Sequence, residues 1–512
     1  MNTKINVSSL PSAPQWKKIG PYHHHGICLP LLSLRNPNSS GIGEFLDLIP
    51  LIHWCKEIGF NVIQLLPLND SGHDPSPYSA HSAMALHPIY LSLKELPFIE
   101  KFQEQLEPLK KCNGSKRVHY HMVLAAKEAF LRHYAENSFP DIKQWPAYQE
   151  FVQQEWLQGY VEYKALKEIN RELPWWEWKS STKPTRQELE YHKFVQFLCF
   201  EQMKQVKKVA DEKKIFLKGD IPILINRDSA DVWQYRDFFT LEYAAGAPPD
   251  NYSKEGQYWG FPLYHWQKLE EDGYSWWKRR LAIAEQFYHI YRLDHIVGFF
   301  KIWAIPLGKK SKEGFFIPQD ENMWLPQGEK ILRMMLQSSS MLPIGEDLGS
   351  VPDSVRHSMQ ELGICGTKVM RWERHWQGDQ SYILPKEYPP LSMTCLSTHD
   401  SETLDVWWQA FPDEAQLQAK ALGVEYSEQL EQATRKQIIR ASHKSSSLFH
   451  INLLQEYLNV FDELAWANPD DDRINIPGKV LERNWTYRFF PTLQEITSHA
   501  GLRDFMNSLT ES

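Results

Sequence analysis

The 512-residue sequence contains few cysteines, and they are scattered along the chain. There are six of them, with no Cys-x-x-Cys pair: Cys28, Cys55, Cys112, Cys199, Cys365 and Cys395. This pattern argues against a disulfide-stapled scaffold or a zinc ribbon and fits a reducing compartment. No apolar run approaches the ~20 residues that a membrane-spanning helix needs, and the polar first 18 residues lack the apolar core of a signal peptide. We therefore expect a soluble, cytoplasmic protein with no membrane partner.

The sequence also lacks a strong excess of charge and the common phosphate and metal motifs. Its 56 Lys and Arg residues oppose 64 Asp and Glu residues, a net charge of −8, so no broad positive field favours nucleic acid. There is no HExxH, EF-hand loop or P-loop. Gly41-Ile-Gly43 begins like a dinucleotide fingerprint, but Leu46 replaces the required third glycine. We interpret residues 23–25, three consecutive histidines, as a loop and expect neither a metal nor a cofactor.

Aromatic residues, by contrast, are abundant. The chain has 20 Trp, 22 Tyr and 25 Phe, which together make up 13% of it. Aromatic rings fill hydrophobic cores, and they also offer flat faces on which sugars stack. The count by itself does not decide between these two uses.

Strand-like and helix-like segments alternate along the chain. Residues 26–34 are apolar, a helical apolar stripe runs from Phe45 to Cys55, and Gly59 ends it before a second apolar run over 60–66. The same unit recurs as a helix over 194–209 before a strand over 215–225, and as a helix over 355–362 before a strand over 368–372. This alternation predicts a closed (β/α)₈ barrel or a doubly wound sheet.

Two stretches interrupt the alternation. Residues from about 95 to 190 are charged, rich in tryptophan and helix-like, and residues from about 243 to 280 are rich in Gly, Pro, Tyr and Trp. The chain has no internal repeat or low-complexity segment. We interpret residues 1–512 as a single catalytic domain in which both stretches are insertions on βα loops.

Carboxylates follow four of the apolar runs, where functional groups of βα proteins collect. They are Asp220, Asp294, Glu346 and Asp400. Any one of them could merely cap the next helix, but several at successive strand ends are harder to explain that way. The sequence therefore predicts a cluster of carboxylates at the carboxyl end of the strands.

Arg292 and Asp294 are two residues apart in a strand-like segment, so their side chains should point to the same side. The guanidinium would favour the ionised form of Asp294, as a nucleophilic carboxylate requires. Glu346 lies in an apolar setting where desolvation could raise its pKa, as a general acid requires. Such a pair is what retaining glycoside chemistry uses.

At these residues the sequence resembles a known family, the 4-α-glucanotransferases of the amylomaltase (disproportionating enzyme) type, glycoside hydrolase family 77. The resemblance covers nearly the whole chain and is carried by motifs in the family's order. They are Leu29-Pro-Leu-Leu-Ser-Leu-Arg35, Gly41-Ile-Gly43, Gln64-Leu-Leu-Pro-Leu68, Ser76-Pro-Tyr78, Gly219-Asp-Ile-Pro-Ile223, Asp228-Ser-Ala-Asp-Val-Trp233, Gly246-Ala-Pro-Pro-Asp250, Gly256-Gln-Tyr-Trp-Gly260, Arg292-Leu-Asp-His295, Gly345-Glu-Asp-Leu-Gly349, Thr398-His-Asp400, Asn475-Ile-Pro-Gly478 and Asn484-Trp485.

The resemblance implies a (β/α)₈ TIM barrel with helical and loop insertions on its C-terminal face. It implies that Asp294 is the nucleophile, Glu346 the acid/base and Asp400 the stabiliser of the transition state. The substrate-binding residues it implies are Arg292, His295, His399, Tyr78, Asp220, Tyr258, Trp259, Asp250, Ser76, Arg371 and Asn475. Residues 246–266 match a loop that closes over the acceptor side. The partners implied are α-1,4-glucans and maltooligosaccharides, as donor and acceptor, and no cofactor is needed.

The sequence leaves other functions open. The carboxylate motifs do not reveal whether water or a sugar accepts the glycosyl group, so an α-1,4-glucan hydrolase of the same barrel class is the first alternative. A non-catalytic glucan-binding protein is the second, although the complete set of three carboxylates argues against it. Chain-length preference and oligomeric state are not readable from the sequence.

Overall fold

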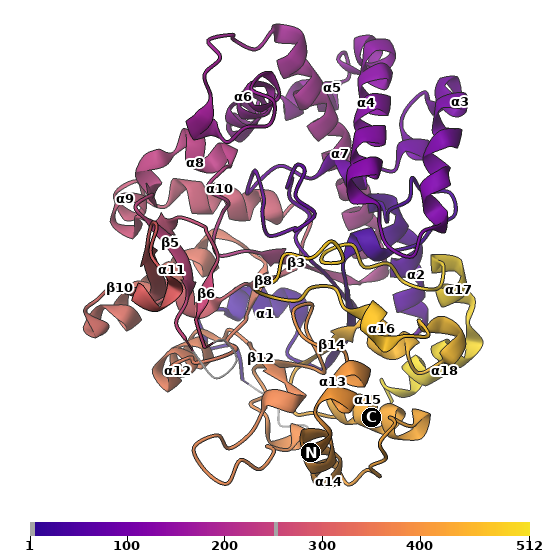
Figure 1. The fold of residues 1–512 in the computed structure, drawn as a ribbon, viewed down its shortest axis with the longest axis vertical. Helices are drawn as coiled ribbons and strands as arrows, with labels where there is room; N and C mark the ends of the chain where they lie inside the picture. Colours follow the sequence, from indigo (N-terminus) through magenta and orange to yellow (C-terminus); the bar gives the residue numbers. More distant parts are fainter. Residues whose placement is uncertain (1–5, 250–253, 512) are drawn as a thin grey trace.

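Eight parallel strands form the centre of the molecule in a computed structural model that describes residues 6–249 and 254–511 (Figure 1). The strands are β1 (His24–Leu29), β2 (Val62–Leu65), β3 (Phe216–Ile221), β8 (Ile290–Leu293), β11 (Leu342–Gly345), β12 (Gly366–Val369), β13 (Ser392–Cys395) and β14 (Phe449–Leu453). Consecutive barrel strands pair with each other except β11 and β12, which are the two edges of the sheet, and β14 pairs with β1. A parallel bridge between Ile344 and Cys365 joins β11 to the start of β12. The structure confirms the (β/α)₈ barrel and not the doubly wound sheet.

Three strands end earlier than the apolar runs predicted. β1 stops before Pro30, β2 before Leu66-Pro67 and β3 before Pro222. Proline has no N–H to continue the ladder of hydrogen bonds, so it ends the pairing even where the apolar run goes on. The predicted strand over 368–372 is also wrong at its end, because Met370–Trp372 forms a 3-10 turn after β12.

Helices cover most of the barrel's outer face between consecutive strands. They include α2 (Leu48–Glu57), α7 (Arg186–Lys213), α10 (Ser275–Ala284), α11 (Trp324–Ser338), α12 (Asp353–Leu362) and α15 (Gln432–His443). The described stretch between β12 and β13 holds short 3-10 turns and no α-helix. Pro385, Pro389 and Pro390 lie in that stretch and disfavour a helix.

The stretch predicted as a helical insertion holds α4 (Tyr120–Ile142), α5 (Pro146–Phe151) and α6 (Glu155–Ile169) between β2 and β3. These helices gather with α7 on one side of the barrel, in the purple part of Figure 1. The second interruption contributes to a separate antiparallel sheet in the order β10-β9-β5-β6. Its strands are β5 (Tyr243–Ala247), β6 (Gln257–Tyr258), β9 (Ile302–Pro306) and β10 (Phe315–Ile317).

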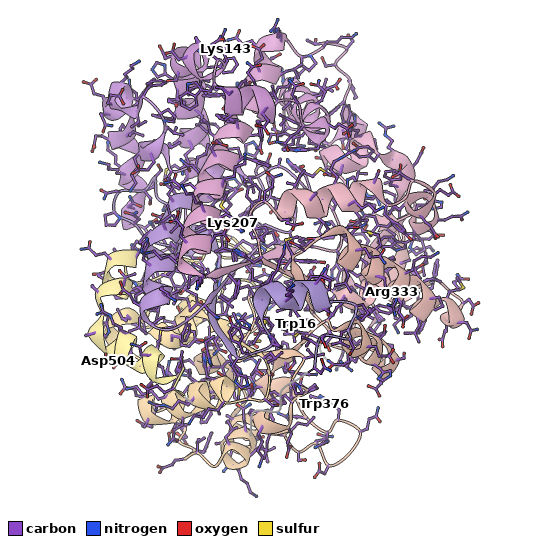
Figure 2. All side chains as sticks on the ribbon, turned by 180° about the vertical axis from the view of Figure 1, so that it is seen from behind. Trp16, Lys143, Lys207, Arg333, Trp376 and Asp504 are labelled. Atoms are coloured by element: carbon purple, nitrogen blue, oxygen red, sulfur yellow. The ribbon has the colours of Figure 1, made fainter. Side chains whose placement is uncertain are left out.

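The N-terminal end of the barrel is covered by α1 (Ala13–Ile19). Its Trp16 is fully buried, packs near Phe449 at the start of β14, and donates a hydrogen bond from Nε1 to the carbonyl of Gly363 (2.9 Å). Figure 2 shows this helix and Trp16 near the middle of the molecule, seen from behind. Among the described residues, no helix is both long and apolar enough to cross a membrane.

Of the three histidines interpreted as a loop, His23 lies outside the strands, but His24 and His25 begin β1. Phe449 and His450 of β14 stand opposite His24 and His25 and supply backbone partners. β1 therefore starts two residues before the predicted apolar run over 26–34.

Candidate active site

Backbone pairing places two of the predicted carboxylates at adjacent strand ends. The N–H of Asp294, just after β8, donates to the carbonyl of Ile221 on β3 (3.3 Å). The N–H of Glu346, just after β11, donates to the carbonyl of Leu293 on β8 (2.9 Å). Both residues therefore continue the parallel ladder past the strands, which holds their side chains on the rigid rim of the barrel.

One guanidinium joins three of the carboxylates. Nη1 of Arg292 lies 3.0 Å from both oxygens of Asp220 and 2.8 Å from Oδ1 of Asp294. Nη2 of Arg292 lies 3.8 Å from Oε2 of Glu346. The predicted contact between Arg292 and Asp294 is confirmed. The same arginine also reaches the neighbouring strands β3 and β11, a contact that the i, i+2 spacing does not predict.

Glu346 is held by backbone donors in a desolvated position. The N–H groups of His295 and Leu348 donate to its two oxygens at 2.9 and 2.8 Å. Burial raises the pKa of Glu346 to about 7, although Arg292 acts in the opposite direction. His295 has a left-handed backbone (φ 47°), a conformation that costs about 1–3 kcal/mol and often occurs at functional sites.

Asp400 lies in the loop after β13, and about half of its side chain is exposed. Nδ2 of Asn475 donates to its Oδ1 (2.7 Å), and Nε2 of His399 lies 3.4 Å from its Oδ2. Partial burial would raise the pKa of Asp400, but His399 and Asn475 outweigh it and bring the pKa to about 2. Asp400 is thus an anion at neutral pH, whereas Glu346 retains a proton in part of the molecules.

Tyr78 connects these two parts of the site. Its hydroxyl donates to Oδ2 of Asp220 (2.8 Å), and its ring stacks on His399 with the centroids 5.2 Å apart. Trp485 packs against both rings, at 5.5 Å from Tyr78 and 5.8 Å from His399. Together they form an aromatic wall beside the carboxylates.

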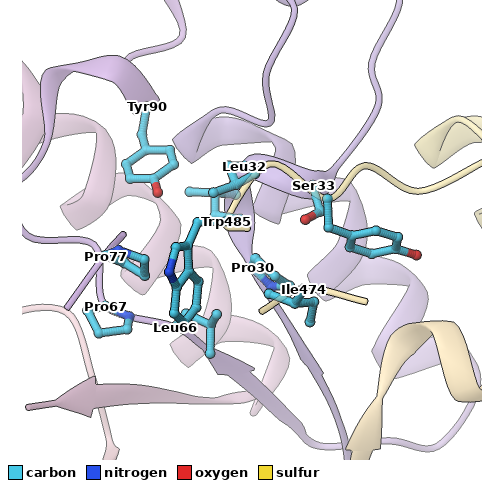
Figure 3. Close-up of a pocket in the computed structure, with 11 residues that line it drawn as sticks. Pro30, Leu32, Ser33, Leu66, Pro67, Pro77, Tyr90, Ile474 and Trp485 are labelled. Carbon is cyan, nitrogen blue, oxygen red and sulfur yellow. The ribbon is translucent and has the colours of Figure 1, made fainter. Parts of the chain in front are cut away.

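Behind this wall lies a small apolar pocket (Figure 3). Trp485 stands between Pro77 and Leu66 on one side and Pro30 and Ile474 on the other. These residues come from loops far apart in the sequence, so the pocket fixes the ring of Trp485 against the cleft. Trp485 belongs to the motif Asn484-Trp485, which supports the family resemblance. The positions of Tyr78 and Trp485 in the sequence did not indicate that the two rings are in contact.

The second sheet brings an aromatic side chain to the opposite edge of the cleft. The ring of Trp259, directly after β6, meets His295 edge to face at 4.9 Å. Its neighbour Tyr258 is 51% exposed on β6. Asp250, the remaining residue expected on this side, lies outside the described residues.

Two predicted binding residues are not joined to the carboxylate cluster. Ser76 lies in the loop before Tyr78, where its N–H donates to Oδ1 of Asp74 (2.9 Å). Arg371 is buried and donates from Nη2 to the carbonyl of Glu402 (2.7 Å). Its Nε and Nη1 atoms are buried without a hydrogen-bond partner, so this guanidinium has unused donors.

The site combines the groups that a carboxylate-based transfer of a glycosyl group requires. Asp294 is a carboxylate paired with Arg292, and Glu346 is a carboxyl group that can give and take a proton near pH 7. The guanidinium of Arg292 sits where a cation would have to bind between Asp220 and Asp294. The arrangement itself therefore supplies positive charge without a metal at this position.

Comparisons with known proteins agree with the fold and the motifs. The sequence profile described as 4-alpha-glucanotransferase matches residues 29–492. A 4-alpha-glucanotransferase of Chlamydia caviae is 46% identical, with 96% of each chain covered, and one of Thermus thermophilus is 31% identical, with 93% of this chain and 96% of the other covered.

Among solved structures, an amylomaltase from Streptococcus agalactiae in complex with acarbose has the same fold. It superposes with a TM-score of 0.81 at 22% identity, over 95% of this chain and 98% of the other. On the match to the family profile and to these relatives, the chain belongs to the 4-alpha-glucanotransferase family of enzymes.

Proposed function

We propose that the protein transfers a segment of an α-1,4-glucan to the 4-hydroxyl of an acceptor glucose or maltooligosaccharide, by a retaining double displacement. The observation that carries this proposal is the pair of strand-end carboxylates around Arg292, one paired with the guanidinium and the other, Glu346, with a pKa raised to about 7. Family membership supports the substrate class.

In the first half of the reaction, Oδ of Asp294 attacks C1 of the donor glucose. The bond between C1 and the glycosidic oxygen breaks, and Glu346 gives its proton to that departing oxygen. The reducing-end fragment leaves, and a β-linked glycosyl-aspartate remains. Arg292 pairs with Asp294 before the attack, and burial raises the pKa of Glu346 to about 7, so that this carboxyl group can hold a proton to give.

In the second half, the 4-hydroxyl of an acceptor attacks C1 of the glycosyl-aspartate. Glu346, now a carboxylate, takes the hydroxyl proton as the C1–Oδ bond breaks. A new α-1,4 bond forms with the original configuration, and both carboxylates return to their starting state. No step requires a cofactor.

The remaining residues bind the sugar at the cleavage point. Asp400 is the anion that faces the developing positive charge of the oxocarbenium-like transition state, and His399 and Asn475 hold it in place. Tyr78 offers a ring face to the glucose, which its hydrogen bond to Asp220 orients. Sugar binding by Ser76 and Arg371 is proposed on the family match alone, because Arg371 is buried and its Nη2 donates to the carbonyl of Glu402.

The choice between sugar and water as acceptor depends on the side of the site that carries Trp259 and Tyr258; Asp250, which the family match assigns to the same side, lies outside the described residues. Trp259 leans on His295, the residue after the nucleophile. A sugar stacked there would be held in attack geometry and would displace water. This arrangement favours transfer over the hydrolase alternative.

Trapping of the intermediate tests the proposed chemistry. A fluorinated maltosyl fluoride that reacts fast in the first step and slowly in the second should label the peptide containing Asp294, as seen by mass spectrometry. Asp294→Asn should abolish labelling and reduce turnover at least about 10³-fold, while glucan binding persists. The matched control Asp353→Asn, at an exposed carboxylate on α12, should keep full activity.

Labelling of a different residue, or unchanged turnover in the Asp294→Asn protein, would contradict the assignment. Retained glucan binding with no turnover in the wild-type protein would favour the glucan-binding alternative instead.

A further inference from the structure

A cluster of histidines lies at the N-terminal end of the barrel, opposite the carboxylates. His25 is near the start of β1, His450 is near the start of β14, and His443 is the last residue of α15. The strand register places His25 directly beside His450. One ring nitrogen from each of the three residues lies within 4.8 Å of the other two.

Hydrogen bonds at the back of two rings leave lone pairs that face the cluster. Nε2 of His450 lies 3.2 Å from the carbonyl of Ser445, so this nitrogen carries the proton and Nδ1 carries the lone pair. His450 is fully buried, and its Nδ1 atom has no hydrogen-bond partner. A buried polar atom without a partner is costly, and it is a sign of a ligand that the site can hold.

His443 is oriented in the same way. Its Nε2 lies 2.8 Å from the hydroxyl of Tyr457, which donates its own proton to the carbonyl of Gly26 (3.1 Å). The tyrosine oxygen therefore accepts from Nε2–H, and the lone pair of His443 is on Nδ1. This is the arrangement by which metal-binding histidines are held by a second layer of groups.

His25 completes the set. Its Nδ1 lies 2.8 Å from Nδ1 of His443, a distance that requires one proton between them, which His25 donates. If the proton of His25 moved from Nδ1 to Nε2, the imidazole would stay neutral. Its Nδ1 lone pair would then be free to bind a cation between the two rings. His25 is only partly buried, which provides a route for an ion to enter.

We propose that His25, His443 and His450 form a zinc site that fastens α15 to the seam between the first and last strands of the barrel. Three imidazoles with no sulfur ligand suit zinc, with water in the fourth position. This site departs from the sequence-based expectation of no metal. Its place at the bottom of the barrel indicates a role in stability.

Zinc titration of the chelator-stripped, full-length protein tests the proposal. With a chromophoric competitor, the wild-type chain should bind one zinc per chain and gain thermal stability on binding. His450→Gln should lower the affinity about 100-fold or more, and Tyr457→Phe, which removes only the outer hydrogen bond, about 10-fold. His357→Ala, at an exposed histidine on α12, should leave zinc binding unchanged. Transferase activity should be the same with and without zinc.

Cobalt provides a readout that does not depend on variants. Cobalt bound at this site should give the intense visible absorption of a four-coordinate nitrogen site, even if the His450→Gln protein fails to fold. No stoichiometric zinc in the wild-type protein, equal zinc affinity in all the variants, or only the weak spectrum of hydrated cobalt would overturn the proposal. In each case the cluster would be a set of hydrogen-bonded neutral histidines.

Discussion

Arg292 is the residue on which the electrostatics of the site depend. One guanidinium serves Asp220, Asp294 and Glu346, so three carboxylates face a single positive charge. Like charges this close disfavour full ionisation of the set. Burial raises the pKa of Glu346 to about 7 and also raises that of Asp220, while Arg292 contacts Asp220 more closely than Glu346 and opposes the rise at both.

The raised pKa of Glu346 predicts the pH dependence of the reaction. Glu346 must be protonated for the first half of the reaction, and its raised pKa means that it loses the proton as the pH rises through about 7. We therefore expect kcat/KM for maltotriose to fall about tenfold per unit on the alkaline side. An activated aryl maltoside, whose leaving group needs little protonation, should keep its rate there. A flat profile for maltotriose between pH 6 and 9 would show that Glu346 is not the acid.

The sequence predicted that the strand-end carboxylates lie together, but it did not predict their surroundings. The i, i+2 rule brought Arg292 and Asp294 together, because strand geometry is local. The contact between Tyr78 and Trp485 joins loops about 400 residues apart, and no periodicity reports on such a contact. No sequence pattern indicates either that the N–H of His295 donates to Glu346, a hydrogen bond that depends on the left-handed turn at His295.

At the level of elements, the helices are held at their ends by particular residues. α12 ends at Gly363, whose backbone is left-handed (φ 76°) and whose carbonyl accepts from Ser12 and Trp16 of the N-terminal segment. α14 (Pro412–Leu422) ends in the same way at Gly423 (φ 68°), but this end has no neighbour within 4 Å of an added Cβ. The two helix ends differ only in their packing.

This difference predicts unequal costs for one substitution. Gly423→Ala should lower the free energy of unfolding by about 1 kcal/mol, the cost of a left-handed alanine. Gly363→Ala should cost about 3 kcal/mol, because its Cβ would lie 2.1 Å from Oγ of Ser12 and would push α1 away. Urea unfolding of both variants measures the two values. Equal losses would mean that the contact between α1 and this helix end contributes nothing to stability.

Element order could be predicted from the sequence, and the ends of the barrel strands could not. The stripe from Phe45 to Cys55 and the stop at Gly59 locate α2 correctly, because helix periodicity is a local signal. The ends of β1 and β3 were set by Pro30 and Pro222, which an apolar average overlooks. The start of β1 was set by its partner β14, which only the closed barrel brings alongside.

At the scale of the whole molecule, the barrel supplies the carboxylates and the second sheet supplies the far edge of the cleft. β8 and β11 end directly before Asp294 and Glu346, β13 leads into the loop that carries Asp400, and β6 ends directly before Trp259. We propose that an α-1,4-glucan bound at the carboxylates lies between Tyr78 and Trp259, and that the glycosyl group therefore passes to a sugar and not to water.

The balance of reducing ends during maltotriose conversion tests that claim most directly. The products are separated by size while total reducing ends are counted in the same samples. Transfer predicts glucose together with maltotetraose and longer chains, with no net rise in reducing ends, because each bond broken is matched by one formed. A rise in reducing ends that keeps pace with maltotriose consumption, without longer products, would contradict the account and identify a hydrolase.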